Sequence, residues 1–116
     1  MLDFISFSPA NAATLLAAAA FLVGAVINAS GRPGIRDDFV RYGFPPWWCW
    51  ITAILELATA VLLLLRPTFL IGAALGACIM LVAILAVLRA GHVRHSLPPA
   101  LFLALLVAAV FVQSFS

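Results

Sequence analysis

The stretch that decides the fold runs from residue 49 to residue 65 and reads CWITAILELATAVLLLL. As a helix, its 17 residues would extend about 25 Å, close to the thickness of a bilayer core. Its one charged residue is Glu56. An ionised carboxylate near a bilayer centre costs at least about 2.5 kcal/mol, so such a group faces the protein interior, finds a partner or is neutral. Glu56 is therefore the first candidate for a functional residue.

Four apolar stretches of this kind fill most of the chain, at about residues 10–29, 48–65, 69–88 and 97–115. Each has the roughly 17 to 25 residues that a membrane-crossing helix needs. The 116 residues are 66% hydrophobic and 9% charged, which leaves too few polar side chains to cover a soluble surface. We predict one all-α membrane domain over residues 1–116, a bundle of four transmembrane helices with a short interfacial or re-entrant segment between the first two.

The distribution of positive charge predicts an orientation in the cell membrane. All six cations are arginines, and Arg66 alone lies in the second connection. The first and third connections hold the other five, which are Arg32, Arg36, Arg41, Arg89 and Arg94. The positive-inside rule then places these two connections in the cytoplasm and both termini outside. This bias accounts for the net charge of +2, so we expect no nucleic-acid partner. Residues 1–8 lack a basic residue, so we expect no cleaved secretory signal there.

The second span has a polar face that contains Thr52, Glu56 and Thr59 at helical spacing. We expect this face to point into the bundle, away from lipid. There Glu56 either stays protonated or meets an arginine that reaches inward from the first connection. Arg41 is the best placed of these arginines, because it lies in the aromatic segment that leads into the span.

That aromatic segment, residues 39–48, reads FVRYGFPPWW. Its two prolines forbid a regular helix across it, and its rings suit the headgroup region of a membrane. We expect a short amphipathic or re-entrant segment at the cytoplasmic end of the bundle. Two roles stay open for it: a belt that anchors the second span, or a lid over an inward-facing pocket.

Other candidate motifs indicate structure more than chemistry. The Gly72-x-x-x-Gly76 pattern is typical of close helix packing in membranes. His92 and His95 would provide two neutral ligands in a solvated connection, so we expect no metal site. The chain has no nucleotide-binding glycine loop, no nucleophile elbow and no acid and base pair. Whether it catalyses any reaction is left open, although autonomous catalysis is not expected.

A set of short segments resembles the DoxX-like family of small four-helix membrane proteins, over most of the chain from about Gly24 onward. The segments include Gly43-Phe44-Pro45-Pro46, Leu55-Glu56-Leu57, Leu88-Arg89-Ala90-Gly91 and Leu97-Pro98-Pro99-Ala100. The resemblance implies a four-helix fold. It also implies links to membrane redox complexes, including quinone-linked sulfur oxidation, to soluble oxidoreductase partners, and to assembly of other membrane proteins.

The chain also departs from that family's pattern. Relatives often carry a lysine near the end of the first span and Thr-His in the third span, where this chain has Ile27-Asn28 and Ala86-Val87. Glu56 and Arg89 stay as polar positions that the resemblance carries over, together with Arg41 and Tyr42. Any activity that uses the missing groups is therefore not implied for this chain.

The sequence and the resemblance leave three possible functions. The first is binding of an apolar, quinone-like ligand as a small subunit that supports a membrane redox complex. Its expected ligand-binding residues are Glu56, Thr52, Tyr42, Arg41, Trp47 and Trp48. The second is a structural or assembly partner of other membrane proteins, and the third is a proton-coupled small-molecule transporter. The expected surroundings are the lipid bilayer and a membrane or soluble oxidoreductase, and a homodimer is left open.

Overall fold

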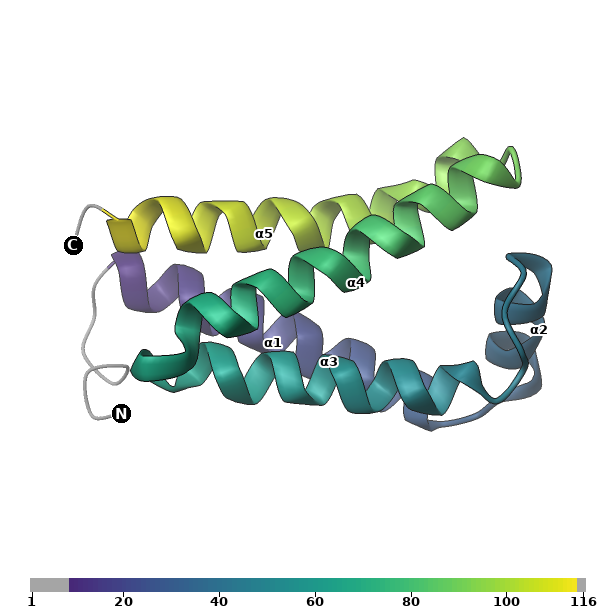
Figure 1. Ribbon diagram of the computed structural model, residues 1–116, viewed down its shortest axis with the longest axis horizontal. Coiled ribbons are helices and arrows are strands. Elements are labelled where there is room, and N and C mark those ends of the chain that lie inside the picture. Colours follow the sequence, from purple (N-terminus) through teal and green to yellow (C-terminus); the bar gives the residue numbers. More distant parts are fainter. Residues whose placement is uncertain (1–8, 115–116) are drawn as a thin grey trace.

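The computed structural model describes residues 9–114, and the elements in this part of the chain are helices (Figure 1). They are α1 (Pro9–Ala29), α2 (Pro33–Arg41), α3 (Trp48–Leu64), α4 (Phe69–Arg89) and α5 (Leu97–Ser114), with single 3₁₀ turns at η2 (Arg66–Thr68) and η3 (Val93–Ser96). The all-α prediction is confirmed for this range. The expectations that concern residues 1–8 and the last residue of the fourth span lie outside the described residues.

Within residues 9–114, three segments are long and apolar enough to cross a membrane: Asn11–Ala29, Arg66–Arg89 and Val93–Ser114. They correspond to α1, α4 and α5, and they support the prediction of a membrane protein. The fourth predicted span corresponds to α3, an apolar helix of 17 residues. At 1.5 Å per residue α3 is about 25 Å long, somewhat shorter than a typical hydrocarbon core of about 30 Å.

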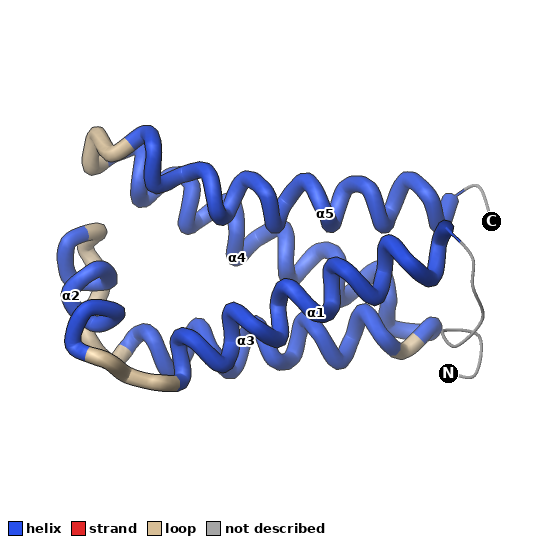
Figure 2. The backbone as a smooth tube through the Cα atoms, turned by 180° about the vertical axis from the view of Figure 1, so that it is seen from behind, coloured by secondary structure: helices blue, strands red, loops and turns tan. Residues whose placement is uncertain are grey.

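The four long helices pack as a ring in the order α1, α3, α4, α5, so that α1 also contacts α5. α2 lies across the end of the bundle at which α4 connects to α5 (Figures 1 and 2). Toward that end the α1/α3 pair diverges from the α4/α5 pair, whereas the pairs lie closer together toward the chain termini (Figure 2). The helix pairs therefore lie close together at one end of the bundle and farther apart at the other.

Glycines on α4 allow the close packing at the tight end. A Cβ added at Gly76 would lie 2.8 Å from Leu106 of α5, 2.9 Å from Thr59 of α3 and 3.0 Å from Phe21 of α1. One at Gly72 would lie 2.8 Å from the backbone nitrogen of Leu63. All four long helices thus meet at a position that only glycine fits, because real Cβ contacts are longer than this. The packing role predicted for these two glycines is confirmed.

The segment between the first two long helices contains the nine-residue helix α2, followed by a turn. Pro33 begins α2, and Gly31 before it has a φ of +61°, a conformation that favours glycine. The Trp50 ring covers this turn and donates from Nε1 to the Ala29 carbonyl at 3.2 Å. α2 ends at Arg41, ahead of Gly43, which has a φ of +93°. The prolines at 45 and 46 therefore fall in the turn, as expected.

Candidate functional site

Glu56 is held on the inward face of α3 by two residues of α1. Its side chain is 3% exposed. The Asn28 amide donates a hydrogen bond from Nδ2 to Glu56 Oε1, in a very short contact. Gly24 lies one turn before Asn28 on the same face of α1, and a Cβ there would overlap Glu56 Oε2. α1 thus supplies both a donor for the carboxyl group and the space that it occupies.

The threonines of the same α3 face have separate roles. Thr59 is fully buried and donates from Oγ1 to the Leu55 carbonyl at 2.9 Å, so it bonds its own helix and not Glu56. Thr52 is partly buried, one turn before Glu56. The polar contact that the structure gives Glu56 therefore comes from α1.

Glu56 lies in the wall of a cavity of about 560 Å³, the Glu56 cavity, between the α1/α3 and α4/α5 pairs. Most of its lining is apolar, and the large side chains include Phe39, Phe44, Trp48, Ile79, Met80 and Phe102. Glu56, Asn28 and Thr52 supply polar atoms along the helices, and Glu56 lies about 12 Å from the start of α3 at Trp48 by helical rise. Asp38, Tyr42 and His95 supply them at the end near α2.

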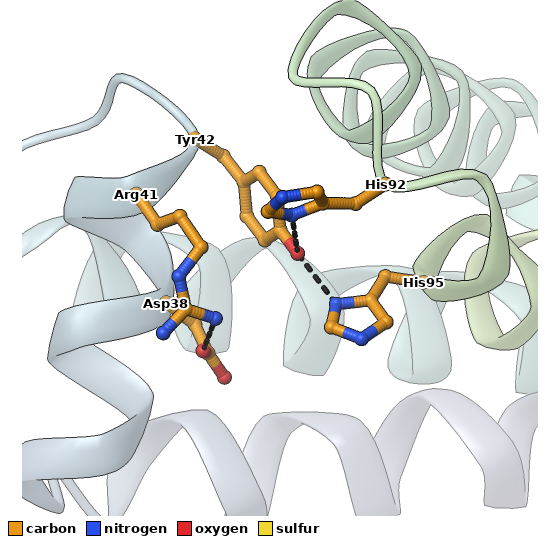
Figure 3. A network of polar contacts seen from close by, with 5 residues as sticks. All are labelled: Asp38, Arg41, Tyr42, His92 and His95. Carbon is orange, nitrogen blue, oxygen red and sulfur yellow. Dashed lines mark hydrogen bonds and ion pairs between the residues drawn. The ribbon is translucent and has the colours of Figure 1, made fainter.

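Four of the six residues expected to bind a ligand line this cavity, namely Glu56, Thr52, Tyr42 and Trp48. Arg41 is not in the lining, and its Nη1 pairs with Asp38 Oδ1 at 3.0 Å on the α2 surface (Figure 3). Trp47 is also outside the lining, 52% exposed, with its ring 5.7 Å from that of Trp48. Neighbouring positions in the turn of a helix point in different directions, which is why Tyr42 faces the cavity and Arg41 does not. Ligand binding by these residues stays a prediction.

Comparison with known proteins identifies the family. The model of the DoxX-like family matches residues 12–109. The chain belongs to the DoxX-like family. Neither the curated proteins nor the solved structures gave a match. Membership confirms the resemblance and, together with the apolar helices, a location in a membrane. The matched range contains every residue that lines the Glu56 cavity.

Sequence reasoning missed the partner of Glu56 in this DoxX-like protein. Asn28 lies near the end of α1, and its amide places a hydrogen-bond donor beside the carboxyl group. A signal was present, because Asn28 is a polar residue in the apolar stretch FLVGAVINA that ends α1. The pairing itself depends on the register of α1 against α3, which neither helix specifies alone.

A second polar cluster, which we call the clasp, joins the end of α2 to the connection between α4 and α5. Its members are Tyr42, His92 and His95. The Tyr42 hydroxyl lies 2.7 Å from His95 Nδ1 and 3.3 Å from His92 Nδ1 (Figure 3). Both histidines are exposed, as expected for a solvated connection, and they also bond a tyrosine 50 or more residues away in the sequence. Among the described residues no group of three or more His, Cys, Asp or Glu side chains is arranged to hold a metal ion.

The chemistry of the Glu56 cavity follows from its donors and walls. A carboxyl group beside an amide can donate to a carbonyl oxygen, and can donate to or accept from a hydroxyl group. Apolar walls strengthen such hydrogen bonds because they keep water away. The DoxX-like protein therefore offers a site for a mostly apolar molecule with a small polar head.

Proposed function

We propose that this DoxX-like protein binds a membrane-dissolved, quinone-like molecule in the Glu56 cavity, with the polar head of the molecule at Glu56 and Asn28. One observation carries the proposal: a buried, hydrogen-bonded carboxyl group lies in the wall of an apolar cavity of about 560 Å³. Ligand sites are commonly apolar clefts of roughly 300–1,000 Å³ with a few well-placed polar groups. The cavity fits this description in both size and lining.

A quinone fits the lining better than a simple acyl chain does. Its carbonyl oxygens can accept hydrogen bonds at the Glu56 and Asn28 end, and its flat ring suits an aromatic wall. Phe102 supplies an aromatic ring at that end, because its Cε2 would lie 3.4 Å from a Cβ added at Gly24, the residue that faces Glu56. An acyl chain would use neither the polar atoms nor the flat rings.

We also propose that α3 crosses the membrane with α1, α4 and α5, which makes four spans. α3 packs between α1 and α4, and its 17 residues reach the lower end of the range for membrane helices. The arginine bias supports cytoplasmic first and third connections and outside termini. α2 and the clasp then lie at the cytoplasmic surface.

The protein would act as a ligand-handling subunit beside a membrane or soluble oxidoreductase, which would carry out the redox chemistry. The competing scaffold role would use small-residue stripes as docking faces. The space beside Gly72 and Gly76 is already occupied by residues of this chain, namely Leu62, Leu63, Thr59, Phe21 and Leu106. These two glycines thus support the bundle itself, which leaves ligand binding as the favoured function.

The test is a titration of purified protein in lipid nanodiscs with decylubiquinone, a short-chain quinone. Quenching of tryptophan fluorescence reports binding, because Trp48 lines the cavity. We expect saturable binding that Glu56→Gln weakens roughly tenfold, the order expected for one altered hydrogen bond to a ligand. The control is Thr59→Val, which changes a buried polar residue of the same face outside the cavity lining. Non-saturable quenching, or equal affinity in Glu56→Gln, would contradict the proposal.

A further inference from the structure

The open end of the bundle is closed by elements that pack weakly. α2 has no buried residue, although Phe39 from its inner side lines the Glu56 cavity. It packs against α3 and thus belongs with the α1/α3 pair. The opposite side of the same opening is formed by His95, Pro98 and Pro99, which precede or begin α5. Apolar burial alone therefore does little to hold α2 over the opening.

The contacts across this opening are polar. The Tyr42 hydroxyl, at the end of α2, bonds His95 and His92 of the α4–α5 connection (Figure 3). The Tyr42 ring also meets both imidazole rings edge to face, with centroids 5.7 Å from His92 and 6.5 Å from His95. Next to Tyr42, a Cβ added at Gly43 would lie 3.3 Å from Arg89 Nη2, so the end of α4 also approaches this turn.

We infer that Tyr42, His92 and His95 form a clasp that holds α2 closed over the end of the Glu56 cavity that contains Asp38, Tyr42 and His95. Opening the clasp frees the end of α2 from the α4/α5 pair and connects the cavity with the aqueous phase. The clasp controls access to the Glu56 cavity, which the proposed function assigns to a ligand. The biological role of the clasp therefore rests on the proposed function. The closure itself rests on the contacts of the three side chains.

The closed clasp separates two routes into the cavity. Cys78 and Val82 of α4 line the cavity and are exposed, although they lie in the middle of an apolar helix that is long enough to cross a membrane. In this proposal an apolar molecule enters from the bilayer, between the helix pairs, while the clasp stays shut. A water-soluble ion has to pass α2, and this passage is what the clasp restricts.

The native Cys78 thiol reports on both routes. It lies about 16 Å by helical rise from the end of α4 at Arg89, deep within the membrane segment. The experiment measures its rate of modification in nanodiscs by mass spectrometry, with a charged methanethiosulfonate reagent and, separately, with membrane-soluble N-ethylmaleimide. Cys49 is fully buried, so its lack of reaction confirms that each variant is folded.

We expect His95→Phe, which removes one hydrogen bond of the clasp, and Tyr42→Phe, which removes both, each to speed the charged reaction roughly threefold to tenfold. The double variant should react no faster than Tyr42→Phe, because that change already removes the hydrogen bond between Tyr42 and His95. The reaction with N-ethylmaleimide should stay the same throughout. Ser30→Ala is the control, since the hydroxyl of Ser30 contacts only nearby backbone: it donates to the Ile27 carbonyl at 2.6 Å and accepts from the Arg32 N–H at 3.5 Å.

An unchanged charged reaction in both single variants would overturn the clasp. An equal rise in the reaction rate with both reagents would also overturn it, because that pattern indicates general loosening of the bundle. So would a double variant in which the effects of the two single changes multiply. None of these measurements needs a ligand. A chain that binds no quinone can still show the clasp, and a chain that binds quinone can lack it, so the two proposals fail independently.

Discussion

At the residue scale, α1 fixes the position of the Glu56 carboxyl group in two ways, through a hydrogen-bond donor and through the space beside a glycine. Asn28 gives one hydrogen bond, while Gly24 leaves the space that Oε2 fills. Any larger residue at position 24 would push the carboxyl group from this place. The cost of leaving a buried carboxyl group without its partner is about 1 to 3 kcal/mol or more.

A pair of glycine variants tests this point. Gly24→Ala places a methyl group on Glu56 Oε2, and we expect a loss of roughly 1 to 3 kcal/mol in stability, as in overpacked cores. Gly34→Ala is the matched control, because a Cβ there meets nothing within 4 Å and α2 is helical at that position. It should be neutral or stabilising by up to about 1 kcal/mol. Thermal unfolding in detergent measures both, and equal melting temperatures for the two variants would contradict this description of the Glu56 site.

Part of this site can be found in the sequence and part cannot. Glu56 stands out because it is a lone carboxylate in an apolar run, and Tyr42 and Trp48 because they border it. Arg41 was the expected partner on grounds of proximity along the chain, but Asp38, one turn earlier on the same helix, binds it. Asn28 and His95 reach the site through contacts between distant segments, and no local pattern encodes these.

At the element scale, α3 differs from the other long helices. It carries the buried Glu56, and at 17 residues it is the shortest of the four. A short helix that holds a polar group fits a bilayer by local thinning or by tilting of its neighbours, at modest cost. Whether α3 crosses decides which sides of the membrane the first and second connections face.

Single cysteines in the connections test the crossing. With Cys49 and Cys78 replaced by alanine, we expect Pro67→Cys to react with a membrane-impermeant thiol reagent added to intact cells. Gly34→Cys and Arg94→Cys should react only after the cells are permeabilised, because the arginine bias places them inside. If positions 34 and 67 reacted from the same side, α3 would not cross. If all three positions reacted from the opposite side to the one expected, the predicted orientation would be wrong, but α3 would still cross the membrane.

Most of the fold at this scale follows from the sequence. Apolar runs and their lengths predict the four long helices, and Pro45 and Pro46 predict the break before α3, whereas the positive φ of Gly31 and Gly43 is seen only in the structure. The helical nature of α2 was less evident, because residues 33–41 are polar and short for a helix on their own. The divergence of the helix pairs depends on contacts that no single helix defines.

At the scale of the whole molecule, tight packing and open space lie at opposite ends. Gly72 and Gly76 bring the helices together at one end, in the way that small residues do in membranes. At the other end large aromatic side chains line the space, and the clasp ties the two pairs together. The cavity exists because the pairs meet closely at one end only.

The central claim is that this space holds an apolar ligand at Glu56, and the most direct test asks what the purified protein already carries. Native mass spectrometry of detergent-purified protein, with organic extraction of the bound material, compares the wild type with Glu56→Gln and the control Thr59→Val. We expect a quinone or similar apolar molecule in the wild type and in Thr59→Val, and its loss from Glu56→Gln at unchanged melting temperature. Empty wild-type protein, or equal ligand content in all three, would contradict the claim.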